Sequence, residues 1–228
     1  MQSAVDTGGL QHFDGTFMLM EMELLPTWFL QRHLGFAGSD DDRATLERAF
    51  DFIVQSALAQ PQAFMHRDYH SRNLLIAGAD VATSAPGGLP NPAIIDFQGA
   101  FVGPITYDLA SLLRDCYIEW DAARVDAWME SHRQRLRDLQ LIETDVDTPQ
   151  FRRWFDLIGL QRHIKVLGIF CRLWYRDGKP SYLADLPLVW RYVITVAQRY
   201  PELAALVALL QCARGGRDLT LARDEADA

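Results

Sequence analysis

A polar loop set between two apolar segments constrains this chain more than any other feature. Residues 66–73 read His-Arg-Asp-Tyr-His-Ser-Arg-Asn, so Asp68 precedes Asn73 by five positions, and apolar residues lie on both sides. A second short apolar run further along the chain ends in another acid, Asp96. Short apolar runs bounded by turn-forming residues favour strands. We therefore predict a β-hairpin that presents its polar ends at a cleft.

The two strands of this hairpin are separated by a long connection. Its second half, residues 85–92, reads Ala-Pro-Gly-Gly-Leu-Pro-Asn-Pro. Three prolines and two glycines in eight residues rule out the interior of a helix or a strand. We expect an irregular insert, which accounts for the long interval between Asp68 and Asp96.

The spacing of Asp68, Asn73 and Asp96 resembles that of the catalytic residues in protein kinases. Protein kinases build their catalytic loop on His-Arg-Asp, with an Asn after four further residues, and a later Asp-Phe pair follows on a strand. There the first Asp accepts the proton of the acceptor hydroxyl, and the Asn and the strand-borne Asp hold magnesium. The pattern predicts phosphoryl transfer from ATP, with Asp68 as catalytic base and Asn73 and Asp96 as Mg²⁺ ligands. Carboxylate and amide oxygens are the hard ligands that Mg²⁺ prefers.

Two further residues are candidates for supporting this loop. His66 is interpreted as a structural histidine that forms hydrogen bonds beneath the loop. Asp108 has two interpretations. It is either a first-turn acid that interacts with its own helix dipole, or a brace that accepts hydrogen bonds from loop backbone N–H groups.

The same loop permits a metal-hydrolase interpretation. His66, Asp68 and His70 alternate, so on a strand they would share one face and could bind a metal through imidazole nitrogens. No later cluster of histidines or acids completes such a site. Phosphoryl transfer is therefore the favoured interpretation.

Helical patterns dominate the rest of the chain. Ser39 and the three acids after it form a strong N-terminal helix signal. We predict an α+β, mostly helical fold that resembles the large lobe of a protein kinase, with a small catalytic β-hairpin. A loose segment (1–20) and a polar, frayed tail (214–228) flank the lobe (21–213). The predicted helices cover residues 40–58, 107–113, 121–139, 151–175, 188–199 and 201–212, and residues 17–34 are predicted to form a helix or a helix-turn around Pro26.

Composition narrows the possible partners and location. The formal net charge of −8 argues against general nucleic-acid binding, which needs a basic face. Three widely spaced cysteines predict reduced thiols. Neither a signal peptide nor a bilayer-spanning run is visible, so we predict a cytoplasmic protein without membrane contact.

An aromatic and cationic segment near residue 175 is a candidate for sugar binding. Trp174 and Tyr175 could stack on a sugar ring, and Arg176 could meet a carboxylate. A packed helix terminus explains the same residues equally well.

Several motifs together resemble the aminoglycoside phosphotransferase/choline kinase-like family. Within it, the chain is similar to the bacterial anomeric kinases of N-acetylmuramate and N-acetylglucosamine that act in cell-wall recycling. The resemblance covers residues 21–186. The segments that carry it are EMELLPTWF (21–29), HRDYHSRN (66–73), IDFQ (95–98), GPITYDLASLLRD (103–115), GLQRH (159–163) and YRDGKP (175–180).

This resemblance implies an ATP- and Mg²⁺-dependent sugar kinase that forms a sugar 1-phosphate, with Arg72 among the residues that bind the sugar. Two alternatives stay open: a kinase for an aminoglycoside or an amino alcohol, or a non-catalytic sugar-binding remnant. Arg67 stands where antibiotic-modifying members commonly have glycine, which weakens the aminoglycoside interpretation.

The small lobe of such kinases would supply a glycine-rich phosphate loop and a strand lysine. Neither is visible ahead of the catalytic loop, since Lys165 and Lys179 are the only lysines. We therefore expect a chain without its N-terminal lobe, through truncation or because another polypeptide supplies it. For this chain alone we expect weak ATP binding and little turnover.

Overall fold

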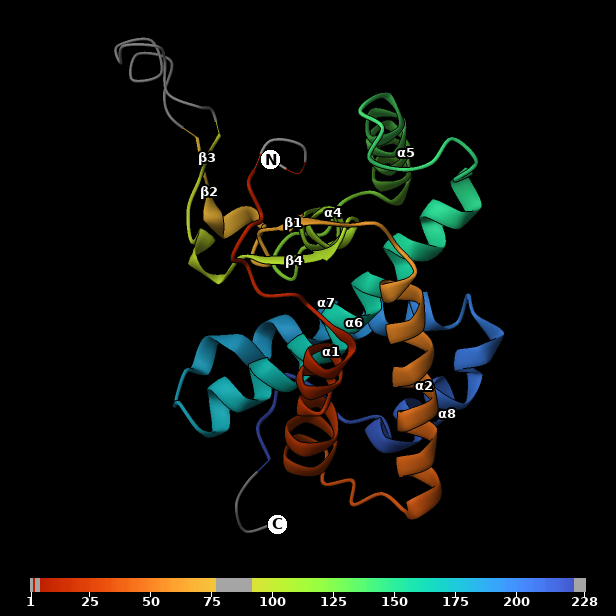
Figure 1. Ribbon diagram of the computed structural model, residues 1–228. Coiled ribbons are helices and arrows are strands. Elements are labelled where there is room, and N and C mark those ends of the chain that lie inside the picture. The colour runs from red at the N-terminus through yellow and green to blue at the C-terminus, as the bar shows by residue number, and fades with distance from the viewer. Residues whose placement is uncertain (1, 3–4, 77–91, 224–228) are drawn as a thin grey trace.

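One long helix, α6 (Thr148–Tyr175), runs through the middle of the molecule (Figure 1). The structure is a computed structural model that describes residues 2, 5–76 and 92–223. Every α6 residue from Trp154 to Gly168 is buried. A helix that is buried all round is a core element, so the other helices gather about it.

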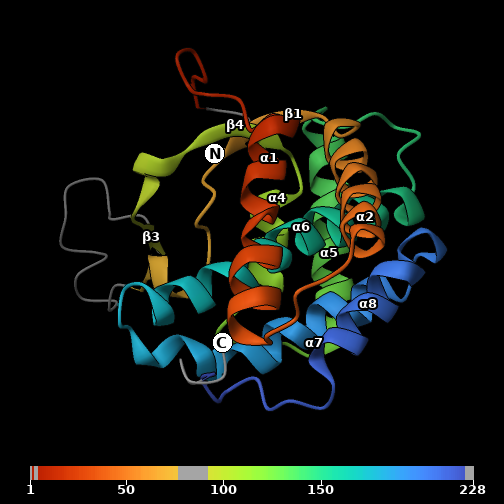
Figure 2. The ribbon, with the colours of Figure 1, turned by 90° about the horizontal axis from the view of Figure 1, so that it is seen from below.

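Other helices lie around α6 and pack against it (Figures 1 and 2). Gly168 permits one close approach, because a Cβ there would lie 2.4 Å from the backbone carbonyl of Leu24. Among the described residues no helix is both long and apolar enough to cross a membrane. The elements packed on α6 are α1 (Gly15–Met22), the π-helix η1 (Leu25–His33), α2 (Asp40–Leu58), α4 (Tyr107–Leu113), α5 (Ala122–Asp138), the 3-10 helix η4 (Pro180–Asp185) and α7 (Leu186–Ala197), while α8 (Ala204–Arg214) packs on α2 and α7.

The start of α2 follows directly from its sequence. The Ser39 hydroxyl accepts a hydrogen bond from Asp42 N, and the Asp42 carboxylate accepts one from Ser39 N, which is a capping box. The buried residues of α2 recur at helical spacing from Leu46 to Ala57. The predicted helices are confirmed in position, with small shifts at their ends; the region 17–34 divides into α1 and η1.

Among the described residues, four short strands form two separate antiparallel pairs. Strands β2 (Leu74–Leu75) and β3 (Ala93–Ile94) make the predicted hairpin, which Figure 1 shows away from the helical body. Most of its predicted irregular connection, residues 77–91, lies outside the described residues. The other pair, β1 (Gln62–Met65) with β4 (Phe101–Pro104), was not predicted. It forms the base from which the loop of residues 66–73 leaves the fold.

The described parts of both terminal segments, residues 5–20 and 214–223, contact the core, which the sequence does not predict. Phe13, inside the segment predicted to be loose, is 1% exposed and its N–H donates to the Val102 carbonyl at 2.8 Å. Leu219, inside the predicted tail, is 2% exposed and its carbonyl lies 3.1 Å from His33 Nε2. In each segment a large apolar side chain reaches the core and fixes the backbone around it.

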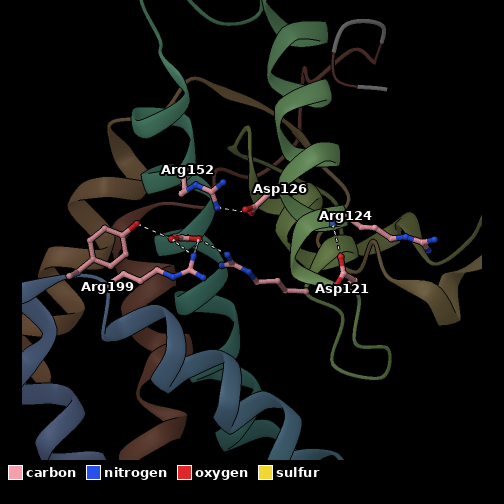
Figure 3. Close-up of polar contacts among 8 residues, drawn as sticks. Asp121, Arg124, Asp126, Arg152 and Arg199 are labelled. Atoms are coloured by element: carbon pink, nitrogen blue, oxygen red, sulfur yellow. Dashed lines mark hydrogen bonds and ion pairs between the residues drawn. The ribbon is translucent and has the colours of Figure 1, made fainter.

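Contacts between charged side chains attach α5 to the core (Figure 3). Arg152 of α6 donates to Asp126 of α5 at 2.8 Å, and Asp121 caps the start of α5. Deeper in the core, the fully buried carboxylate of Asp156 accepts hydrogen bonds from Arg114, Arg199 and the Tyr200 hydroxyl. A buried carboxylate with several donors joins α4, α6 and the end of α7.

His33 links η1 to the C-terminal segment as a neutral imidazole. Its Nε2 donates to the Leu219 carbonyl, because a carbonyl only accepts, so Nδ1 accepts from the Tyr175 hydroxyl at 3.0 Å. Burial lowers the pKa of His33 to about 4, from an ordinary value near 6.5.

This depressed pKa predicts acid sensitivity. The contribution of neutral His33 is complete above pH 6.5 and is lost as the pH falls toward 4, where protonation favours the unfolded chain. We expect His33 to lower the free energy of unfolding by about 2 kcal/mol between pH 7 and pH 5. Urea unfolding at both pH values, compared with His33→Gln, measures it. An equal loss in the variant would contradict the assignment.

Candidate active site

The structure brings Asp68, Asn73 and Asp96 together at the base of the hairpin. Asn73 ends the 3-10 helix η2 (Ser71–Asn73), and its Nδ2 donates to the Asp68 backbone carbonyl at 2.9 Å. The same Nδ2 lies 3.4 Å from Asp96 Oδ2. Asp96 follows β3 with a positive φ of 68° and also accepts from Gln98. The amide of Asn73 thus connects the two acid-bearing segments.

These residues provide an oxygen-rich donor set of the kind that magnesium uses. Asp96 is exposed, and the Nδ2 hydrogen bonds of Asn73 leave its Oδ1 without a donor within the described chain. Nowhere in the described residues do three His, Cys, Asp or Glu side chains converge as a metal site. Magnesium commonly binds through one or two carboxylates together with substrate phosphates, which fits this sparse set.

The Asp108 side chain fixes the start of the loop by binding the loop backbone. Its carboxylate oxygens accept hydrogen bonds from His66 N at 2.7 Å and Arg67 N at 3.0 Å. Burial raises the pKa of Asp108, while the two N–H donors oppose that rise. The geometry matches the second interpretation of Asp108, in which the carboxylate accepts hydrogen bonds from the loop backbone.

The structure corrects two interpretations that involve His66. The ring is 1% exposed, but neither ring nitrogen has a hydrogen-bond partner among the described residues. It instead packs edge-on against Tyr69, with ring centroids 5.8 Å apart. The metal-hydrolase interpretation also fails, because Arg67 adopts a left-handed φ of 76° and breaks the alternation that a shared strand face requires.

Asp115 is a structural residue of the site that the sequence reasoning missed. It accepts hydrogen bonds from Ser71 N at 2.8 Å and Tyr117 N at 3.0 Å, so it fixes the second half of the loop. One signal was available: Asp115 follows the C-terminal end of α4, where the helix dipole disfavours an acid. An acid at such a place indicates a partner elsewhere.

Glu21 is a second residue that the sequence reasoning missed, and it lies beneath the loop. It is 5% exposed and pairs with Arg67 at 2.5 Å and with Lys165 of α6 at 3.0 Å. Gln161 also donates to it, at 3.2 Å. Burial raises the pKa of Glu21, but the charges of Lys165 and Arg67 outweigh it and hold the pKa below its ordinary value. The sequence signal was an acid on the apolar face of α1, next to buried Met18 and Met22.

The left-handed conformation of Arg67 gives a prediction about backbone strain. A side chain with a Cβ is strained at a φ of 76°, whereas glycine adopts it freely. Arg67→Gly and Arg67→Ala both remove the ion pair with Glu21. We therefore expect the glycine variant to be the more stable of the two by about 1 kcal/mol in urea unfolding. An alanine variant of equal or greater stability would show that the conformation is not maintained.

The candidate sugar-binding residues lie in different surroundings. The Tyr175 hydroxyl meets His33 and the Arg223 backbone N–H, and Arg176 pairs with its neighbour Asp177. Trp174 is partly buried against the core. Trp174 and Tyr175 thus take part in a packed helix terminus, whereas Arg176 is exposed. Arg72, by contrast, lies within the catalytic loop, exposed and stacked on Tyr117.

A helical body that carries such a loop defines a kinase-like phosphotransferase, and comparison with known proteins agrees. The sequence profile described as the phosphotransferase enzyme family matches residues 2–142. The chain belongs to this family. The matched region contains Asp68, Asn73, Asp96 and Asp108.

Three curated relatives are named N-acetylmuramate/N-acetylglucosamine kinase. The chain is 40% identical to the one from Pseudomonas putida, 41% to that from Pseudomonas aeruginosa and 39% to that from Neisseria meningitidis. The matches cover 88%, 90% and 92% of this chain. They cover 56%, 58% and 59% of the relatives, so the chain spans little more than half their length.

Proposed function

We propose that this chain carries the catalytic residues of a kinase that transfers the γ-phosphoryl group of ATP to the anomeric hydroxyl of N-acetylmuramate and N-acetylglucosamine. The observation that supports this most directly is the bridge from Asn73 to the Asp68 backbone and the Asp96 carboxylate. The names of three relatives near 40% identity supply the sugar class.

The proposed step is simple in its bonds. The anomeric oxygen attacks the γ-phosphorus, its proton passes to the Asp68 carboxylate, and the bond from the γ-phosphorus to the bridging oxygen breaks to release ADP. An anomeric hydroxyl is more acidic than an ordinary alcohol, which suits a carboxylate base. No hydrogen bond or ion pair within the described chain engages the side chain of Asp68, so it is available to an incoming hydroxyl.

Asp96 and Asn73 would hold magnesium, which neutralises phosphate charge when bound. The remaining work of the protein is positioning. Asp108 fixes the start of the loop and Asp115 its second half. These two contacts would hold the backbone of the loop that carries Asp68 and Asn73, which is the positioning that such catalysis requires.

Product analysis tests this proposal. The purified protein is incubated with Mg-ATP and either sugar, and ³¹P NMR identifies the phosphorylated position. We expect a sugar 1-phosphate and loss of the reducing end. Phosphorylation at the 6-hydroxyl would overturn the anomeric assignment. Turnover with an aminoglycoside or with choline, but not with either sugar, would overturn the substrate class.

A further inference from the structure

Arg72 presents a charged planar group next to the catalytic residues. It belongs to the loop that carries Asp68 and Asn73, and its guanidinium carbon lies 3.4 Å from the centroid of the Tyr117 ring. The side chain is exposed, and within the described chain it makes neither a hydrogen bond nor an ion pair. One face of the guanidinium is therefore covered by the ring, while its N–H donors remain available to a ligand.

The ring beneath Arg72 is held by the rest of the fold. Tyr117 packs against His70 with centroids 5.6 Å apart, and against Phe170 of α6 at 6.1 Å. Phe170 in turn packs against Tyr182, with ring centroids 5.1 Å apart. Asp115 accepts hydrogen bonds from both Tyr117 N and Ser71 N. One carboxylate thus fixes the ring and the loop together, which places Arg72 relative to Asp68.

The charges around Arg72 leave it available for an anion. Asp185 is one of the nearby acids, with Asp68 and Asp115: burial raises the pKa of Asp185 and the charge of Arg72 opposes that rise, but Asp185 and Arg72 form no ion pair. Within the part of the chain that the structure describes, Arg72 is thus a stacked cation without a salt-bridge partner.

We propose that Arg72 binds the carboxylate of an acidic amino-sugar acceptor and gives the site its preference for the acidic over the neutral sugar. This inference rests on the proposed function. N-acetylmuramate differs from N-acetylglucosamine by one lactyl ether, which carries the carboxylate. A stacked guanidinium matches a carboxylate with two parallel N–H donors, and a lysine in its place lacks that planar fork.

The two sugars form a matched ligand pair for the test. Binding of each to the purified chain is measured by isothermal titration, without turnover, for wild type, Arg72→Gln and Arg72→Lys. We expect Arg72→Gln to weaken N-acetylmuramate binding about tenfold or more, because a charge-assisted pair is lost. N-acetylglucosamine binding should change less than twofold. The affinity of Arg72→Lys for N-acetylmuramate should lie between the affinities of wild type and Arg72→Gln. Its affinity for N-acetylglucosamine should stay close to that of wild type.

Each other outcome overturns a definite statement. Equal weakening for both sugars would show that Arg72 maintains the site without selecting the carboxylate. Unchanged binding of both would place the lactyl group elsewhere. Weaker binding of Mg-ATP with sugar binding intact would assign Arg72 to the nucleotide phosphates. Wild type that binds neither sugar would instead overturn the proposed function, and the inference with it. An unchanged urea midpoint in each variant confirms that the fold is retained.

Discussion

Replacing Asp68 by Asn is expected to lower kcat by a factor of about 10²–10⁴, which is the usual contribution of a general base. The amide cannot take the proton of the acceptor hydroxyl, although it retains the shape of the carboxylate. Asn73 bonds to the backbone carbonyl of Asp68, not to its side chain, so the loop should keep its conformation. Rates of ADP release with Mg-ATP and N-acetylmuramate measure the effect, and the KM for the sugar should change little.

Asp51→Asn is a matched control, because Asp51 is an exposed acid on α2 in the helical body. We expect it to leave kcat and the urea midpoint unchanged. Asp68→Asn should likewise leave the urea midpoint unchanged while it abolishes most turnover. A kcat for Asp68→Asn within threefold of wild type would remove Asp68 from the role of base, whatever the product of the reaction.

Glu21→Ala is expected to destabilise the fold by about 3–5 kcal/mol, because it leaves buried positive charge without its partner. Glu21 is the carboxylate that both Arg67 and Lys165 contact, and its side chain is 6% exposed. The loss removes the support beneath the catalytic loop. We therefore expect weaker sugar binding to accompany lower stability.

Glu23→Ala is the control that separates the effect of burial from the loss of an ion pair. Glu23 lies two residues further along and makes a 2.8 Å ion pair with Arg43, but the side chains of that pair are 40% and 48% exposed. An exposed pair contributes about 1 kcal/mol or less, because solvent screens it. Urea unfolding of both variants measures the difference. Equal destabilisation by the two substitutions would show that Glu21 is not the centre of a buried charge network.

Local patterns predicted the helices well. The stripe from Leu46 to Ala57 and the Ser39 cap define α2 because both signals act within a few residues of each other. The hairpin of β2 and β3 was also predicted, since each strand lies next to a polar motif with recognisable spacing. Signals of this kind do not depend on which distant segments meet.

Local patterns did not predict the contacts between segments that are far apart in the sequence. Strand β4 is too short to show a period of its own, and it forms because β1 lies beside it. The buried network of Glu21, Arg67 and Lys165 joins α1, the loop and α6, which no local pattern brings together. The expected hydrogen bonds of His66 were wrong for the same reason, because the groups that surround its ring are set by the packing of distant segments.

The sequence by itself determined the elements and the chemical groups of this protein: the helices, the hairpin, and an Asp, an Asn and a second Asp at spacings suited to phosphoryl transfer. The tertiary structure alone decided how those groups are held. Asp108 and Asp115 approach the loop from either end of α4, and Glu21 supports it from α1. Helix and turn propensities act over a few residues, whereas a buried carboxylate takes its partners from whichever distant donors packing brings within hydrogen-bond distance.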